Sequence, residues 1–151
     1  MAAGLPVLWL KSSIIPLLGD GAPTESLLLP IGPHAAGEMT VASFTRGPVL
    51  RSSLMPPVFA AGTPREGASG WWGVWNRDVL QDYRQFAAVH RGSCNILFAD
   101  GGVRSVDDSN KDGYLNNGFP ATPTSGFADD KEEMPLKDCA SLYSLNAVEL
   151  P

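Results

Sequence analysis

The clearest pattern of apolar and polar residues in the chain lies between residues 93 and 106. Residues 93–99 are rich in apolar and strand-favouring side chains, and residues 103–106 form a second such run. Asp100-Gly101 lies between the two runs. This dipeptide is typical of a two-residue type I′ turn, which needs positive φ at both central positions. The pattern therefore predicts a β-hairpin in which Phe98 lies opposite Val103.

In that register, both faces of the hairpin carry apolar side chains. One face has Cys94, Ile96, Phe98 and Val103. The other face has Asn95, Leu97, Arg104 and Val106. We therefore expect the hairpin to lie inside a sheet and to pack on both sides.

A helical periodicity precedes the hairpin. Asn76 is a good N-cap, and Asp78 places negative charge in the first turn. Apolar side chains then recur at helical spacing at Val79, Leu80, Tyr83 and Phe86. This spacing predicts one helix over residues 77–87 that leads directly into His90 and the hairpin.

The rest of the chain favours short strands and long connections, because its 16 glycines and 13 prolines interrupt regular structure. We expect strands within residues 5–18, 27–29, 39–44 and 49–54, and irregular loops at 21–37, 55–70 and 120–138. The fold predicted for residues 1–151 is a single α+β domain, with an antiparallel β-sheet, one short helix and long Gly/Pro-rich loops.

The formal net charge of −5 is concentrated in one segment. Residues 107–138 hold eight acidic and three basic residues, whereas the remainder of the chain is balanced. Such a segment repels nucleic acid and suits cations, and no basic stripe is present, so nucleic-acid binding is excluded. The apolar start, residues 5–18, contains Pro6, Lys11 and Pro16 and is too short to cross a membrane.

The acidic segment contains a calcium-binding pattern, D-x-[DN]-x-[DN]-G, beginning at Asp108. The expected ligands are Asp108, Asn110, Asp112, the Tyr114 carbonyl and Asn116. Position twelve of such a loop should be a carboxylate, and here it is Phe119. We therefore expect Asp129 or Asp130 to close the site. The alternative is an Asx-rich turn that holds no ion.

His90 allows two interpretations. As part of an enzyme it would pair with Cys94 as nucleophile, or with Asp100 and Asp20 in a hydrolytic site. The chain has no G-x-S-x-G motif, and its other histidine, His34, lies far away in a Gly-Pro loop. We therefore favour a structural role, with a buried imidazole that hydrogen-bonds to the hairpin, and we expect no enzymatic activity.

Two further groups of residues leave alternatives open. Trp71, Trp72 and Trp75 are typical of core or loop anchors, and the alternative is a platform for a protein or glycan partner. Cys94 and Cys139 allow one disulfide or two free buried thiols.

Several stretches resemble a family of bacterial prepilin-like proteins. His90, nine intervening residues and Asp100-Gly101 resemble the C-terminal H-x(9)-DG motif of that group. Residues 13–20 (SIIPLLGD), 43–48 (SFTRGP) and 80–84 (LQDYR) resemble it as well, in the same order. The hydrophobic pilin helix of the family is missing here. We therefore expect this chain to be the C-terminal part of a longer prepilin-like protein.

The resemblance implies a pseudopilin-like globular domain that acts outside the cytoplasm, at the cell surface or in the extracellular space. Its expected role is that of a structural or assembly subunit of a filament or secretion system. Its expected partners are copies of itself or related pilin-like subunits. That location also favours a disulfide between Cys94 and Cys139.

Overall fold

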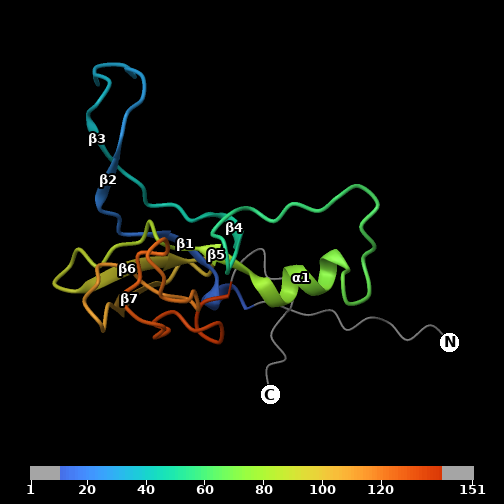
Figure 1. The fold of residues 1–151 in the computed structure, drawn as a ribbon. Coiled ribbons are helices and arrows are strands. Elements are labelled where there is room, and N and C mark those ends of the chain that lie inside the picture. Colours follow the sequence, from blue (N-terminus) through green and yellow to red (C-terminus); the bar gives the residue numbers. More distant parts are fainter. Residues whose placement is uncertain (1–10, 141–151) are drawn as a thin grey trace.

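A computed structural model describes residues 11–140, which form three small antiparallel sheets and one α-helix (Figure 1). In chain order the elements are η1 (Ser12–Ile14, a 3-10 helix), β1 (Pro16–Gly19), β2 (Pro23–Ser26), β3 (Met39–Val41), β4 (Arg46–Leu50), α1 (Trp71–Asp78), β5 (Val79–Asp82), β6 (Ser93–Phe98) and β7 (Val103–Asp107). The predicted α+β class is therefore confirmed. Residues 5–10 of the first predicted strand lie outside the described range.

The largest sheet has the strand order β1-β6-β7 and contains the predicted hairpin. Its register is one residue away from the prediction, because Leu97, not Phe98, pairs with Val103. The N–H of Phe98 donates to the Gly102 carbonyl (2.8 Å), and the N–H of Gly101 donates to the Phe98 carbonyl (2.9 Å). Within the loop of residues 99–101, only Gly101 has positive φ (+82°), as in a three-residue loop with a left-handed glycine.

This shift changes which side chains of β7 face the core. Arg104 lies opposite Ile96, and its guanidinium stacks on the Phe98 ring at 3.4 Å from the centroid. Val103 lies on the other face and is 64% exposed. The hairpin therefore packs mainly on one side, and the expected packing on both sides is wrong.

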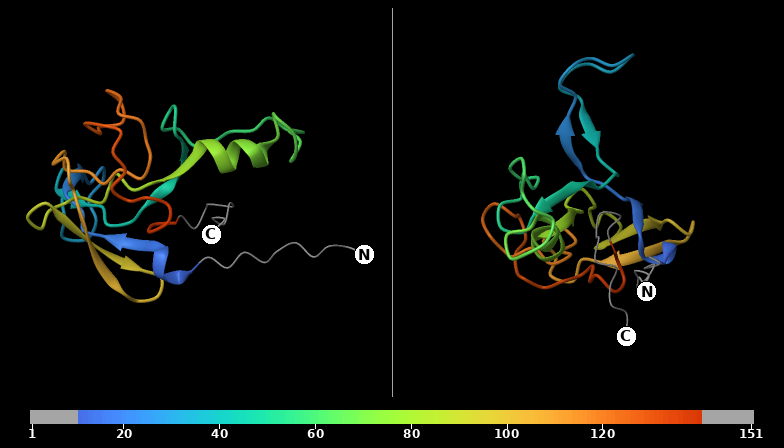
Figure 2. Two further views of the ribbon diagram at one scale, coloured as in Figure 1. Left: turned by 90° about the horizontal axis from the view of Figure 1, so that it is seen from below. Right: turned by 90° about the vertical axis from the view of Figure 1, so that its right-hand side faces the viewer.

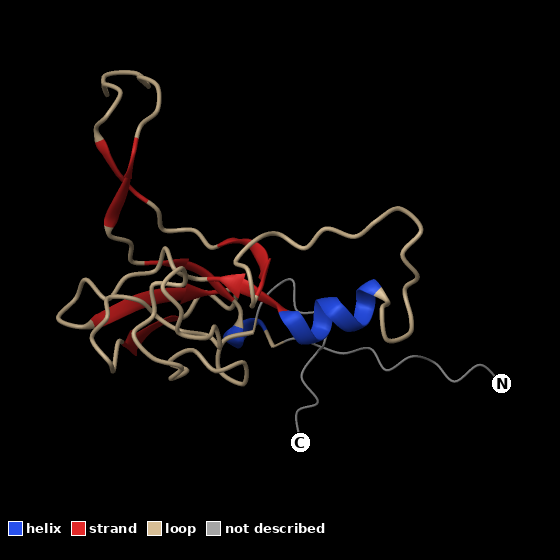
Figure 3. Ribbon diagram, in the orientation of Figure 1, coloured by secondary structure: helices blue, strands red, loops and turns tan. Residues whose placement is uncertain are grey.

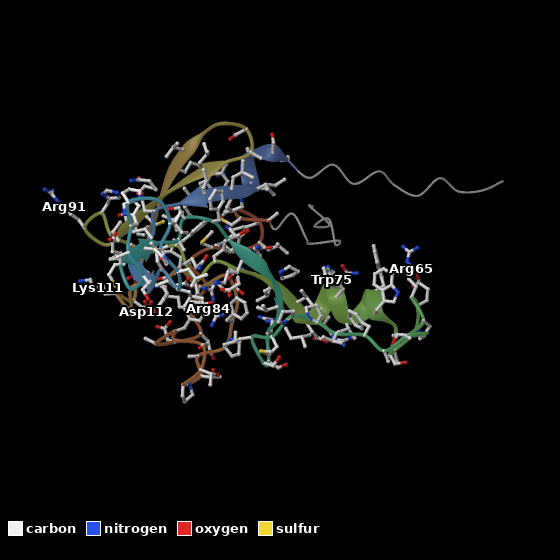
Figure 4. The ribbon with its side chains drawn as sticks, turned by 90° about the horizontal axis from the view of Figure 1, so that it is seen from above. Arg65, Trp75, Arg84, Arg91, Lys111 and Asp112 are labelled. Atoms are coloured by element: carbon white, nitrogen blue, oxygen red, sulfur yellow. The ribbon has the colours of Figure 1, made fainter. Side chains whose placement is uncertain are left out.

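A type I′ turn does occur, at the entrance to β6. Arg91 and Gly92 have φ of +58° and +90°, and His90 and Ser93 exchange two backbone hydrogen bonds (3.0 and 3.2 Å). These features are those of a two-residue hairpin turn. Arg91 extends outward from this turn (Figure 4).

The helix prediction is wrong in position. Residues 79–82 form β5, which pairs with β4 through Val49–Leu80 and Leu50–Val79. Tyr83 and Phe86, in the turn after β5, are buried, whereas Val79 and Leu80 point to opposite faces of β5 and are only partly buried. Backbone pairing with β4 therefore outweighs the local periodicity.

The observed helix, α1, begins at Trp71 and has no side-chain cap. Its first N–H groups are bonded by the preceding loop, since Trp71 donates to the Pro64 carbonyl (3.0 Å) and Trp72 to the Arg65 carbonyl (3.2 Å). A Cβ on Gly70 would lie 2.4 Å from the Arg65 carbonyl oxygen, so this close approach requires glycine.

The loop predictions are confirmed in two places and corrected in the third. Residues 55–70 and 120–138 contain no strand or helix (Figure 3). Residues 21–37, however, contain β2, which pairs with β3 in a hairpin that projects from the body (Figures 1 and 2). The strand expected at residues 27–29 is absent, and the strand expected at 49–54 is β4, which begins at Arg46.

The core consists of two neighbouring groups of side chains. The larger group lies against β6 and contains Tyr83, Phe86, Cys94, Ile96, Phe98, Leu115, Met134 and Cys139. The smaller group contains Val49, Phe119 and Phe127. The irregular segment after β7 therefore supplies much of the core. None of the helices within residues 11–140 has the length and apolar character that crossing a bilayer requires.

Candidate functional site

Asp20 and His90 come together beside the first residues of β6. Asp20 follows β1, and His90 precedes the Arg91-Gly92 turn. The imidazole Nε2 lies 3.2 Å from Asp20 Oδ2. The His90 side chain is 60% exposed, so the prediction of a buried imidazole is wrong, although the ring does have a partner.

Asp20 has a structural role in addition to this ion pair. Its Oδ2 accepts a hydrogen bond from the Asn95 N–H (2.6 Å), and its own N–H donates to the Asn95 carbonyl (3.0 Å). Its carbonyl accepts from the Ala87 N–H (2.8 Å). Asp20 therefore joins β1, β6 and the segment that leads to His90.

The cysteine near this pair is not an activated nucleophile. Cys94 is fully buried in the larger core group, and burial raises the pKa of its thiol to about 11. Its Sγ lies 3.6 Å from the Asp20 carbonyl oxygen. A thiol of this pKa stays protonated at neutral pH, whereas a nucleophilic cysteine needs a thiolate.

Asp82 and Arg84, at the end of β5, form a second pair. The carboxylate of Asp82 is almost completely buried, and the guanidinium donates to it twice (2.8 and 2.6 Å). These hydrogen bonds raise the pKa of Arg84. The Arg84 backbone N–H also donates to Asp82 (3.1 Å), so the pair fixes the turn that follows β5.

The four stretches that resemble the prepilin-like group meet in space. The N–H of Gly19 donates to the Ser43 carbonyl (3.0 Å), and the Gln81 amide donates to the Arg46 carbonyl. A Cβ on Gly19 would lie 2.6 Å from Phe86 Cγ, so only glycine allows the ring to pack there. Together with Asp20–His90, these contacts make one continuous structural unit from separate segments.

The acidic loop after β7 is held by its own carboxylates. Asp108 accepts hydrogen bonds from the N–H groups of Lys111, Asp112 and Gly113 (2.6, 3.2 and 2.8 Å). Asn110 Oδ1 accepts from the Asp112 N–H (3.1 Å). Lys111 and Gly113 adopt positive φ (+64° and +92°), which gives the loop its sharp turns.

Of the two carboxylates expected to close the site, Asp129 lies beside this loop. Asp130 does not lie beside it. The Asn110 amide nitrogen donates to Asp112 Oδ2 (3.1 Å) and to Asp129 Oδ1 (3.0 Å). The second of these bonds lowers the pKa of Asp129. Asp130 instead accepts from the Ala121 N–H (2.6 Å).

Sequence reasoning missed the role of Glu133. Its Oε1 accepts from the Ser109 N–H and hydroxyl (2.6 and 2.9 Å), and its Oε2 accepts from the Asn116 N–H (3.2 Å). Asn116 was expected as a calcium ligand, but it is fully buried and bonds to Gly118 and Phe119 through its side chain. No local motif identifies Glu133, because its partners lie 17 to 24 residues earlier.

The donor set of the loop suits calcium only in part. Carboxylate and amide oxygens are the ligands that calcium prefers, and Asp112 and Asp129 are bridged by one amide, that of Asn110. Within residues 11–140, however, His, Cys, Asp and Glu side chains form no group of three or more that could hold a metal ion. A cation between Asp112 and Asp129 would have to replace the Asn110 amide nitrogen.

One known protein family matches more than half of the chain. Its description is "Protein of unknown function (DUF1559)", and the match covers residues 21–113. The chain belongs to this family. No curated protein and no solved structure matches the chain. The matched DUF1559 region includes His90, Asp82 and Arg84, whereas Asp20, Asp129 and Glu133 lie outside it.

Both cysteines of this DUF1559 chain are free and buried. Cys94 and Cys139 belong to the same core group, and burial raises the pKa of Cys139, too, to about 11. The disulfide favoured by the family resemblance is therefore absent from the structure.

The three tryptophans lie on α1, which extends away from the sheets (Figures 1 and 4). Each is half-buried. Trp71 and Trp72 pack edge to face at 5.7 Å, and the Arg65 guanidinium covers the Trp72 ring at 4.6 Å. Trp75 lines a surface hollow beside β4. The aromatic surfaces are thus partly occupied by contacts within the chain.

Proposed function

We propose that this protein is an extracytoplasmic structural or assembly subunit, comparable to the globular domain of a pilin or pseudopilin. The observation that carries the proposal is the meeting of residues 13–20, 43–48, 80–84 and 90–101 in one unit. These are the stretches that resemble the H-x(9)-DG group, and three of them lie within the DUF1559 match. Their side chains serve packing and backbone hydrogen bonds, as a structural role requires.

The arrangement around His90 favours this role over hydrolysis. The imidazole is exposed, its partner Asp20 is committed to the Asn95 N–H, and the nearby thiol of Cys94 is buried. His90 does not line any of four surface hollows found within residues 11–140. A hydrolytic site needs a nucleophile or bound water within reach of the base, inside a cleft.

The proposal includes calcium as a stabilising ion of the acidic loop. Asp108, Asn110, Asp112, the Tyr114 carbonyl and Asp129 are the ligands offered. The ion would neutralise an acidic segment and connect residues 108–116 to residues 127–130. Its role would be to hold the irregular C-terminal part of the core in place.

A binding module is the second candidate, favoured by the half-buried tryptophans on a helix that extends from the body. Its ligand would be a glycan or a protein partner, since tryptophan rings stack on both. A shift of tryptophan fluorescence on titration with soluble glycans would favour this candidate. Unchanged fluorescence throughout would favour the structural subunit.

Localisation in the source organism tests the proposal. A tagged copy of the protein should be digested by protease added to intact cells, and shearing should release it together with other pilin-like subunits. A cytoplasmic marker that remains intact is the control. Recovery of the tagged protein in the cytoplasmic fraction, protected from external protease, would contradict the proposal.

A further inference from the structure

Residues 12–15, which comprise η1 and the residue after it, form a strap across the end of the β1-β6-β7 sheet. Three consecutive carbonyl groups of this strap accept hydrogen bonds from three other segments. The donors are the Arg104 guanidinium to Ser13, the Ala140 N–H to Ile14 (2.7 Å) and the Ala99 N–H to Ile15 (2.9 Å). The strap is therefore the place where β7, the hairpin loop and the C-terminal end of the described range meet.

Arg104 is the donor that also covers the core. Its guanidinium lies over the Phe98 ring at 3.4 Å from the centroid, and Phe98 itself is 1% exposed. Arg104 belongs to β7, the outer strand of the sheet, and is exposed to solvent. One side chain therefore closes the end of the core and holds the strap in place.

The strap has little stability of its own. Its internal backbone bonds are those of the Ile14 N–H to the Lys11 carbonyl (3.0 Å) and of the Ile15 N–H to the Ser12 carbonyl (3.3 Å). Ile15 is its one buried residue. A single 3-10 turn is not stable in isolation, so the position of the strap depends on the donors that come from outside it.

A break in the pairing separates the strap from the rest of β1. The register of β1 against β6 shifts between Pro16 and Leu18, and proline has no N–H to donate. Beyond the shift, the Asp20 N–H donates to the Asn95 carbonyl (3.0 Å), which holds the end of β1 on β6. Local opening occurs where few contacts join a segment to the body, and the strap is such a segment.

From these contacts we infer that the strap opens as one unit while the sheet stays folded, and that Arg104 is the latch that keeps it closed. Opening would uncover the Phe98 ring and remove the partner of the Ala140 N–H. The two ends of residues 11–140 are thus coupled, and a pull or a partner acting on the chain before Lys11 would be felt at Ala140. This coupling goes beyond the proposed function and does not depend on it.

Native-state hydrogen exchange, followed by NMR at increasing urea concentration, tests the strap in the wild-type chain. The N–H groups that report its opening are those of Ile14, Ile15, Ala99 and Ala140. They should share one free energy of opening that hardly depends on urea, because a local opening exposes little surface. The Asp20 N–H, in the sheet, should need a larger free energy of opening with a strong urea dependence.

The latch variant is Arg104→Met, which keeps most of the apolar length of the side chain and removes the donor. Arg91→Met is the matched control, because this arginine extends outward from the turn before β6 (Figure 4). In the latch variant the four reporting N–H groups should exchange roughly tenfold faster, since the strap has lost one of its three outside donors. The Asp20 N–H should keep its wild-type rate, and the control should leave all these rates unchanged.

Three results would overturn the inference. One is a wild-type chain in which the reporting N–H groups exchange only through global unfolding, with the same free energy as the Asp20 N–H. The second is an Arg104→Met chain in which all N–H groups exchange faster by the same factor, as for a residue that stabilises the whole fold. The third is an Ala140 N–H that keeps its wild-type rate in that variant, because the two ends would then not be coupled.

Discussion

Asp20 and His90 face each other at the entrance to β6, with Nε2 and Oδ2 3.2 Å apart. The two residues contribute unequally to the fold. His90 is largely in solvent, whereas Asp20 is mostly buried and also holds the Asn95 N–H. The pair therefore serves mainly to position Asp20, and its two members should respond differently to mutation.

We expect Asp20→Ala to destabilise the fold by about 1–3 kcal/mol, because the Asn95 N–H loses its partner. We expect His90→Ala to cost less than about 1 kcal/mol, because an exposed ion pair contributes little. Urea unfolding of both variants measures the difference. Equal losses, or a larger loss for His90→Ala, would show that the imidazole has a structural role of its own.

Gly19→Ala should destabilise the protein by about 1–3 kcal/mol through overpacking. The new methyl group would meet three ring atoms of Phe86 at 2.6–2.8 Å. Gly47→Ala is the matched control, because it also lies in a strand and its Cβ would have no atom within 4 Å. Similar melting temperatures for the two variants would mean that the Phe86 ring does not lie against β1.

The two cysteines should be free in the folded protein and slow to react. Both thiols are buried, so a thiol reagent should label them only after unfolding. Denatured protein prepared without reductant should show two reactive thiols per chain. A count of zero would establish the disulfide that the family resemblance favours.

The same burial makes stability depend on pH in the alkaline range. The folded-state pKa of each thiol is about 11, and the ordinary value is 9.0. Between these values the unfolded chain loses thiol protons that the folded chain keeps, so the free energy of unfolding falls as pH rises. Each thiol contributes at most about 1.4 kcal/mol per pH unit. Replacing Cys94 with Ala should make the dependence shallower.

Calcium should bind the acidic loop and raise the melting temperature relative to chelator. An ion present at about 100 times its Kd would stabilise the fold by about 2.7 kcal/mol. Asp112→Asn should weaken binding at least tenfold, because it removes a carboxylate and keeps an oxygen that can accept from the Tyr114 N–H. Asp100→Asn, in the exposed hairpin loop, is the control. If millimolar calcium gives no heat in calorimetry and no thermal shift, the loop is an Asx-rich turn.

The sequence predicted the existence of the hairpin, two of the irregular loops and the α+β class, because these depend on local residue types. It misplaced the hairpin register by one residue. Asp-Gly occurs in several turn types, and the turn type sets the register. A type I′ turn would require positive φ at Asp100 as well as at Gly101. Of these two residues, only Gly101 has positive φ.

The helix and the acidic loop show what local patterns miss. Residues 79–82 have helical spacing, yet they pair with β4, a strand about 30 residues earlier. Glu133 organises the acidic loop from the far end of an irregular segment, where no periodicity marks it. The Asp20–His90 contact was foreseen only as part of an enzyme, since exposure and hydrogen-bond partners cannot be read from the sequence.

Cross-linking of intact cells with a membrane-impermeant amine reagent tests the structural role most directly. Such a reagent can reach four exposed lysines: Lys11, Lys111, Lys131 and Lys137. If the protein is an extracytoplasmic assembly subunit, mass spectrometry should find cross-links from these lysines to second copies of the chain or to other pilin-like subunits. Cross-links that form only with a permeant reagent, and only to cytoplasmic proteins, would contradict that role.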